Sequence, residues 1–229
     1  MMRKLIVAGC SFSDRFHVEK SYGEYLSEHL NMEYVHEARS CGSNNAIWRT
    51  ITNKIINKDI TADDILLIQY TEPTRTEFCS YTDPKSTSNV VEKYDDNSYL
   101  IRYKIGAEDW HYEKNISKFL SIYTNNILYD KYEFDKFRFN DYNFQCMLEL
   151  NNINAYFIRV SLYSPEINIL APKLETSEYF NNRIFTQHQK YREHPYCFSD
   201  EDRFHLSDHG HITIAADLYE FLKDKNVAI

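Results

Sequence analysis

A serine follows the first apolar run of the chain at a point where hydrolytic chemistry becomes possible. Residues 4–9 (KLIVAG) are apolar after the lysine and end in glycine, which predicts a short buried parallel strand. Ser11 comes two residues later, in G-C-S-F-S, where the strand passes into a turn. A hydroxyl is a poor nucleophile until a base takes its proton. We therefore expect Ser11 to be a nucleophile whose own backbone N–H faces the developing oxyanion, provided that a histidine reaches it.

The candidate base lies near the other end of the chain, in D-E-D-R-F-H-L-S-D-H-G-H. Asp202 and His205 are three residues apart, in a loop that runs into the last predicted helix. This spacing lets the carboxylate hold one imidazole nitrogen while the other nitrogen faces the serine. The pair therefore predicts the acid and the base of a catalytic triad with Ser11.

The D-x-x-H pattern occurs three times, so position has to choose between the copies. Asp14 and His17 follow Ser11 too closely to fold back on it. Asp208 and His211 fall at the start of the last helix, where we expect His211 to pack in the core. Only the remaining pair stands in a loop ahead of that helix, and we select it for this reason.

Two other chemistries are open to the same residues. Cys10 could be the nucleophile instead of Ser11, although successive side chains leave a strand on opposite faces, which favours the serine. His205 and His209 are four residues apart and could face one metal ion, but no third ligand is evident. We therefore expect neither a metal nor a cofactor.

Alternating strands and helices must position these residues. The hydrophobic pattern predicts a parallel sheet, with two long irregular stretches at its carboxyl edge. The predicted fold is a three-layer α/β/α domain with a mostly parallel, flavodoxin-like sheet, spanning residues 1–229 and carrying a large insertion at about 72–150. The predicted strands cover 4–9, 33–36, 65–68 and 154–160, and the predicted helices cover 21–30, 46–57, much of 116–150 and the C-terminal segment.

The order of these features resembles the SGNH (GDSL-like) hydrolases: Gly-x-Ser after the first strand, a Gly-Ser turn in C-G-S-N-N, and D-x-x-H before a G-H-x-x-x-A helix. The resemblance covers residues 3–72 and 198–222 and fades between them. It implies that Ser11 is the nucleophile, that Asp202 and His205 are its acid and base, and that Gly42 supplies an oxyanion-hole amide.

The chain departs from that family at its third motif, where the family carries an asparagine in G-x-N-D. Here the sequence is Q-Y-T-E-P, so Thr71 or Glu72 takes the place of that asparagine. Asn44, Asn45 or Arg75 could replace the missing oxyanion donor. We expect Asn44 at the oxyanion and Thr71 and Arg75 at the substrate, although the glutamates around Arg75 could instead hold it in an ion pair.

Composition narrows the class of partner and the compartment. The formal net charge is −8, which disfavours a general nucleic-acid binder. The five cysteines are dispersed without a C-x-x-C pair, as in reducing compartments, so we expect a cytoplasmic protein. No apolar run approaches the ~18 residues of a membrane span. Aromatic residues make up 15% of the chain, either as core packing or as a platform for sugar rings.

Together these observations predict a serine esterase that hydrolyses a small O-acyl group, preferably acetyl, on a small-molecule or glycan ester through an acyl-enzyme. The carbohydrate part of this expectation is an analogy to the family that the chain resembles. Two alternatives stay open: an O-acyltransferase with the same triad, and a non-enzymatic carbohydrate-binding or assembly protein on the same scaffold. The sequence does not determine the oligomeric state.

Overall fold

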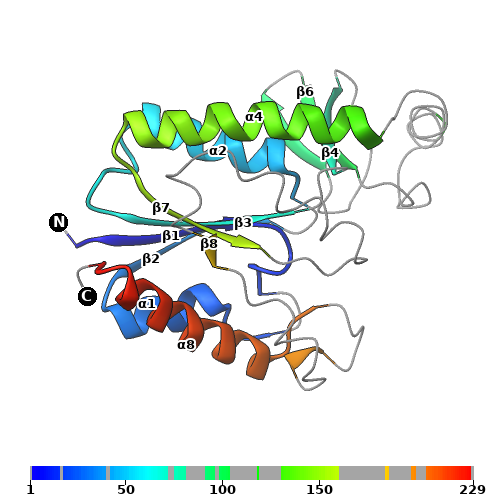
Figure 1. The fold of residues 1–229 in the computed structure, drawn as a ribbon. Coiled ribbons are helices and arrows are strands. Elements are labelled where there is room, and N and C mark those ends of the chain that lie inside the picture. Colours follow the sequence, from blue (N-terminus) through cyan, green and yellow to red (C-terminus); the bar gives the residue numbers. More distant parts are fainter. Residues whose placement is uncertain are drawn as a thin grey trace.

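A five-stranded sheet in the order β2-β1-β3-β7-β8 forms the centre of the computed structural model (Figure 1). Its strands are β1 (Lys4–Gly9), β2 (Glu33–Ala38), β3 (Ile65–Tyr70), β7 (Asn154–Arg159) and β8 (Ile184–Phe185). All neighbouring strands in this sheet pair in parallel, and the order is that of flavodoxin-like folds. The structure describes residues 2–15, 18–39, 42–71, 75–80, 91–95, 98–103, 118, 130–159, 184–185, 197–199 and 205–227.

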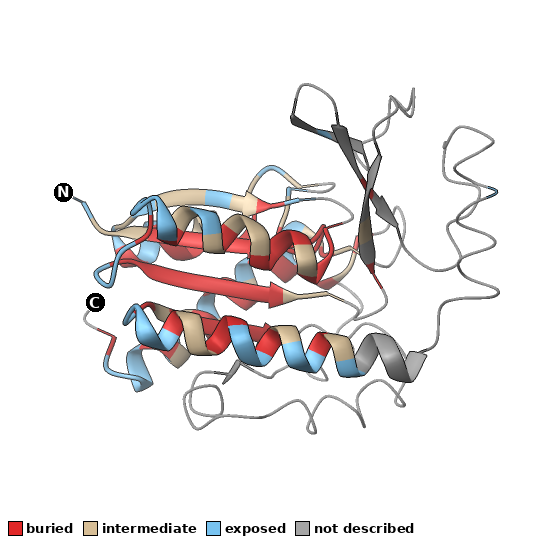
Figure 2. Cartoon of the chain, turned by 90° about the horizontal axis from the view of Figure 1, so that it is seen from above, coloured by how far each residue is buried: buried red, intermediate tan, exposed pale blue. Residues whose placement is uncertain are grey.

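Within the part of the chain that the structure describes, two helices cover each face of the sheet, which confirms the predicted three layers (Figure 1). One face carries α1 (Tyr22–Leu30) and α8 (Asp208–Asp224), and the other carries α2 (Asn44–Ile56) and α4 (Asp130–Leu150). Alternate β1 residues serve the two cores: Leu5 and Val7 pack on the α1/α8 face, whereas Ile6 packs on the α2/α4 face. Burial is continuous along the central strands (Figure 2).

Serines begin three of these helices. The Ser43 hydroxyl accepts the Ala46 N–H at 3.1 Å, and the Ser207 hydroxyl accepts the Gly210 N–H at 3.1 Å. Before α1, the Ser21 N–H donates to the Glu24 carboxylate at 2.9 Å. These caps satisfy backbone groups that the first turn of a helix leaves unpaired. The cap at Ser43 explains why α2 begins two residues before the predicted start.

The predicted insertion contains two parts with different roles. Strands β4 (Thr76–Ser80), β5 (Val91–Asp95) and β6 (Ser98–Tyr103) form a separate antiparallel sheet in the order β4-β6-β5. In contrast, α4 packs on the main sheet through Phe137, Phe144 and Leu148. The last 21 residues of the expected insertion are therefore part of the scaffold. Residues 81–90, 104–117 and 119–129 lie outside the described residues.

Three cysteines within the described ranges are free thiols: Cys10, Cys146 and Cys197. Within the same ranges, no group of three or more histidine, cysteine or acidic side chains could hold a metal ion. No helix among these residues has both the length and the apolar character needed to cross a membrane.

Candidate active site

The hydroxyl of Ser11 and the imidazole of His205 meet at the carboxyl edge of the sheet, 194 residues apart in sequence. Ser11 Oγ lies 3.0 Å from His205 Nε2, within hydrogen-bond range. Ser11 stands in the tight turn after β1, where the Ser13 N–H donates to the Cys10 carbonyl at 2.9 Å. Ser11 is only 6% exposed. The structure thus brings together the nucleophile and base that the sequence predicted.

Backbone hydrogen bonds on both sides of His205 hold it in place. The Ser199 N–H donates to the His205 carbonyl at 2.8 Å, and the Ser207 N–H donates to the Cys197 carbonyl at 3.0 Å. The ring of Phe12 stacks on the imidazole, with centroids 5.3 Å apart and an angle of 26° between the planes. Because Phe12 follows Ser11 directly, one turn supplies both the hydroxyl and the ring that stacks on the His205 imidazole.

A buried hydrogen-bond network anchors the nucleophile turn from below. Ser13 Oγ lies 2.6 Å from the Tyr22 hydroxyl and donates to Gln69 Oε1 at 2.5 Å. Gln69 Nε2 in turn donates to Cys10 Sγ at 3.3 Å. These four side chains are at most 1% exposed. The Cys10 thiol is thus directed into the core and engaged there, so the geometry favours Ser11 over Cys10 as the nucleophile.

His211 packs in the core between α1 and α8, as the sequence predicted. Its Nδ1 accepts the backbone N–H of Tyr22 at 3.0 Å, which requires an unprotonated Nδ1. Burial lowers the pKa of His211 to about 4, because the imidazolium would lose its hydration; the nearby His205 also lowers it, and Glu24 raises it. A neutral imidazole therefore joins the N-terminus of α1 to α8.

The backbone N–H groups of Ser11 and Gly42 are the two expected oxyanion donors, and they differ in whether they already donate a hydrogen bond. The Ser11 N–H donates to no acceptor within the described part of the chain. Gly42 lies against the nucleophile turn, since a Cβ on it would stand 3.0 Å from the Gly9 carbonyl oxygen. However, the Gly42 N–H donates to the Arg39 carbonyl at 2.9 Å. The Ser11 amide is therefore the more accessible of the two donors.

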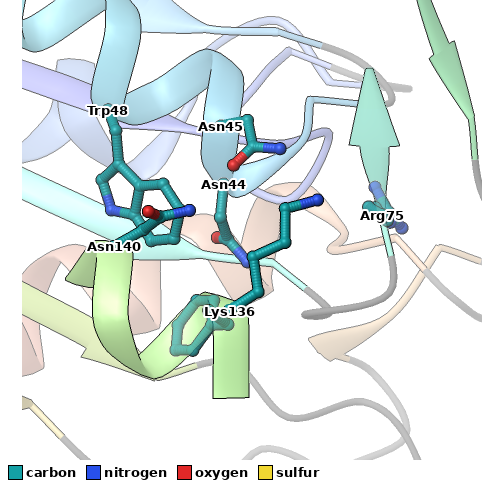
Figure 3. Close-up of a pocket in the computed structure, with 7 residues that line it drawn as sticks. Asn44, Asn45, Trp48, Arg75, Lys136 and Asn140 are labelled. Carbon is teal, nitrogen blue, oxygen red and sulfur yellow. The ribbon is translucent and has the colours of Figure 1, made fainter. Parts of the chain in front are cut away.

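The side chain of Asn44 is bonded to the end of β3. Its Oδ1 accepts the Thr71 N–H at 2.9 Å, and its Nδ2 donates to the Thr71 carbonyl at 3.0 Å. This amide pair fixes the first turn of α2 on the strand that neighbours β1. Asn44 and Arg75 also line one pocket, which contains Asn45 as well (Figure 3).

Other predicted site residues fall elsewhere. Asp202, the expected acid of the triad, lies outside the described residues, as do Glu72 and His17. Asp14 is described, and its carboxylate lies 3.1 Å from His36 Nε2 on the surface. Within the described ranges, Ser11 and His205 are thus the members of the predicted triad that the structure brings into contact.

Sequence reasoning missed the anchor beneath the turn. Ser13, Tyr22 and Gln69 come from three separate segments, and neither their types nor their spacing distinguish them from ordinary turn and core residues. One signal was available: Gln69 is a polar residue within a strand that is otherwise apolar from Ile65 to Ile68. Buried polar side chains require partners, so such a residue predicts a network.

Solved structures with a similar fold include lipolytic enzymes, although neither a protein-family model nor a curated protein sequence matches the chain. The psychrotrophic esterase EstA from Pseudoalteromonas sp. is 11% identical over 97% of this chain and 98% of its own, with a TM-score of 0.56. A lipolytic G-D-S-L family protein from Veillonella parvula is 8% identical over 99% and 100%, with a TM-score of 0.53. A lipase from a goat rumen metagenome is 12% identical over 96% and 97%, with a TM-score of 0.51.

At such low identity these similarities show the fold alone. The chain has the three-layer fold of the SGNH (GDSL-like) hydrolases, in agreement with the resemblance that its terminal motifs carry. The structural neighbours named above are an esterase, a lipase and a lipolytic protein. The Ser11–His205 contact stands at the carboxyl edge of this fold, where ligands of open α/β sheets bind.

Proposed function

We propose that this chain is a serine esterase that removes a small O-acyl group, preferably acetyl, from a carbohydrate. The observation that carries the proposal is the 3.0 Å contact between Ser11 Oγ and His205 Nε2. A hydroxyl held in this way by an imidazole is the arrangement that activates a serine for attack on a carbonyl. The carbohydrate part rests on the analogy with the family, because the fold does not determine the substrate.

The reaction would proceed in two acyl transfers. Ser11 Oγ attacks the ester carbonyl while His205 Nε2 takes its proton, and the Ser11 N–H, joined by Gly42, stabilises the oxyanion. The protonated His205 then gives its proton to the leaving alcohol, which leaves an acyl group on Ser11. Water attacks this acyl-enzyme with His205 again as base, and Ser11 is regenerated. Asp202 is proposed as the acid that orients His205.

No cofactor or metal takes part in this proposal. The substrate-binding roles of Arg75 and Thr71 and the oxyanion role of Asn44 belong to it as proposals. So do the cytoplasmic location and the absence of nucleic-acid and membrane partners. Each is an expectation from the sequence that labelling and turnover experiments can test separately.

Labelling with a fluorophosphonate probe tests the central claim. The native protein should be labelled and should hydrolyse 4-nitrophenyl acetate, and Ser11→Ala should abolish both. Cys10→Ala is the matched control, because it removes the neighbouring nucleophile and leaves the hydroxyl in place; we expect labelling to persist. Labelling that survives Ser11→Ala would falsify the proposal.

One observation supports a second candidate, a carbohydrate-binding protein without activity. The Gly42 N–H and the Asn44 amide are both engaged by backbone groups, so two of the expected oxyanion donors are already bonded. Loss of one such donor typically lowers the rate about 10²–10³-fold. Glycan binding by native protein that resists the fluorophosphonate would establish this candidate. Faster acyl transfer to an added glycan than to water would instead identify an acyltransferase.

A further inference from the structure

A polar pocket opens on the α2/α4 side of the sheet edge (Figure 3). Its residues come from the first turns of α2, from the segment that leads into β4 and from α4, and they border about 210 Å³ of space, part of which is open solvent. Figure 3 shows Lys136 extending from α4 toward the first turn of α2. We name it the Arg75 pocket; it is lined by Asn44, Asn45, Trp48, Arg75, Lys136, Phe137 and Asn140.

The charged side chains among the described residues that line the Arg75 pocket are both basic. Arg75 and Lys136 are cations, and no carboxylate stands among the described residues that line the pocket. The formal net charge of the protein is −8, so these two basic side chains stand together in a chain that is acidic on average. Arg75 is only 8% exposed, and a cation removed from water interacts with an anion more strongly than an exposed cation does.

Neutral hydrogen-bond donors accompany these cations. The amides of Asn45 and Asn140 line the pocket, whereas the amide of Asn44, which also lines it, is bonded to the backbone of Thr71. Trp48 contributes an indole N–H that is buried and has no hydrogen-bond partner among the described residues, although the side chain is 8% exposed. Buried donors nearly always find an acceptor in folded proteins. This combination of charged and neutral donors is suited to an oxyanion such as carboxylate or phosphate.

The Arg75 pocket and the nucleophile share one edge of the sheet. A Cβ on Gly42 would lie 3.6 Å from the Cα of Cys10, so the segment before α2 touches the Ser11 turn. Two residues later, Asn44 lines the pocket and holds Thr71 at the end of β3, the strand beside β1. The pocket is therefore connected to the Ser11 turn through the segment that leads into α2.

From these observations we propose that the Arg75 pocket binds an anionic group, a carboxylate or a phosphate, on the alcohol part of the ester substrate. This inference rests on the proposed esterase function and narrows its substrate to an acidic one. On a carbohydrate, such a group is the carboxylate of a uronic acid or the phosphate of a sugar phosphate.

Pairs of substrates with and without an anionic group test the proposal. Acetylated glucuronic acid is compared with acetylated glucuronamide, and acetylated glucose 6-phosphate with acetylated glucose, so the two arms separate carboxylate from phosphate. We expect native protein to prefer at least one anionic substrate about tenfold or more in kcat/KM, as loss of a charge-assisted hydrogen bond typically implies. In Lys136→Gln and in Arg75→Gln, this preference should fall about tenfold.

The matched control is Arg138→Gln, on the same helix as Lys136. Arg138 is exposed and does not line the pocket, so its loss changes the net charge equally and should leave the preference intact. The proposal is overturned if native protein shows no preference in either arm, or if Arg138→Gln lowers the preference as much as Lys136→Gln does. Lys136 is half-buried on a helix, so its variant keeps the test valid should Arg75→Gln fail to fold.

A binding measurement separates failure of this inference from failure of the esterase proposal. The chain has two tryptophans, so Trp110→Phe leaves Trp48 as the one indole reporter, within the Arg75 pocket. Glucuronate or inorganic phosphate should change its fluorescence in this variant, and additional Lys136→Gln should weaken that binding about tenfold. Binding without fluorophosphonate labelling would retain the anion site and reject the esterase. Labelling without binding or charge preference would reject the anion site alone.

Discussion

The two faces of the sheet carry polar groups of different kinds at the same edge. On the α1/α8 face, two imidazoles are held by specific contacts: His205 beside Ser11, and His211 on the Tyr22 N–H. On the α2/α4 face, the Arg75 pocket gathers two cations and three amides. Ser11 follows β1, an inner strand of the sheet, and so stands at the edge where both faces end. Under the proposed function, proton transfer belongs to the α1/α8 face and substrate recognition to the α2/α4 face.

The two faces are also built from different parts of the sequence. The α1/α8 face is built from the two ends of the chain, which carry the terminal motifs. The α2/α4 face combines residues from α2, β4 and α4, which no single motif covers. Because different residues would bind the substrate and transfer the proton, substitutions on the α2/α4 face could change substrate recognition without altering the proton-transfer groups. It also makes each face testable without the other.

The largest expected effect comes from removing the base. His205→Gln keeps a polar side chain but cannot accept and return a proton, so hydrolysis of 4-nitrophenyl acetate should fall about 10³-fold, or ~4 kcal/mol in activation free energy. The matched control is His209→Gln on the exposed side of α8, which should leave the rate unchanged. Equal losses of hydrolysis rate in the two variants would show that His205→Gln acts by damaging α8 and not by removing the proton acceptor.

The contact between Ser11 and His205 on the α1/α8 face could be predicted because the sequence shows where each residue stands relative to a strand or a helix. An apolar strand followed by Gly-x-Ser fixes where Ser11 emerges, and the loop ahead of the last helix distinguishes His205 from His211. Strand β1 has the predicted limits, and β3 and β7 match within two residues. Parallel strands aligned in one sheet leave few other places for these two side chains to meet.

The remainder could not be read from the sequence because it depends on long-range packing. The Tyr22 N–H and His211 Nδ1 are 189 residues apart, and neither has a local signal for that bond. Lys136 lines the Arg75 pocket from α4, a helix that lies where the sequence predicted an insertion. The bond from the Gly42 N–H to the Arg39 carbonyl depends on turn geometry that the motif C-G-S-N-N does not specify.

Acid should destabilise the α1/α8 face through His211. The pKa of its imidazole is lowered to about 4 in the folded protein, against about 6.5 in an unfolded chain, so the unfolded state binds the proton first as the pH falls. The stabilising contribution is therefore complete above about pH 6.5 and is lost progressively toward about pH 4. Its size is on the order of 3 kcal/mol, at ~1.4 kcal/mol per pKa unit.

Chemical denaturation from pH 7.5 to 4.5 measures this effect. His211→Gln can still present an acceptor to the Tyr22 N–H, yet it cannot titrate, so its unfolding free energy should fall less steeply than that of native protein over this range. The charged or titratable groups that act on His211 are Glu24 and His205, and His205→Gln provides a control for the second. Parallel curves for native protein and His211→Gln would assign the acid sensitivity to other groups.

The smallest expected effect compares one glycine from each face. A Cβ on Gly210 would lie 2.2 Å from the Cys197 carbonyl oxygen, whereas a Cβ on Gly42 would approach the Gly9 and Arg39 carbonyl oxygens only to 3.0 Å. Neither glycine has a left-handed backbone, so space alone opposes substitution. Gly210→Ala must displace backbone, which we expect to lower the unfolding free energy by about 1–3 kcal/mol, and Gly42→Ala by less than about 1 kcal/mol.

The activity of the same variants sharpens the comparison further. The Cys197 carbonyl that Gly210→Ala displaces accepts the Ser207 N–H, two residues after His205, so the base moves with it. Fluorophosphonate labelling of Gly210→Ala should therefore slow about tenfold, because small misplacements of a catalytic group are costly. Gly42→Ala leaves this segment untouched and should slow labelling less. If Gly42→Ala slows labelling more, the oxyanion donor at Gly42 matters more to the reaction than the position of His205 does, and the larger role proposed for the α1/α8 face is wrong.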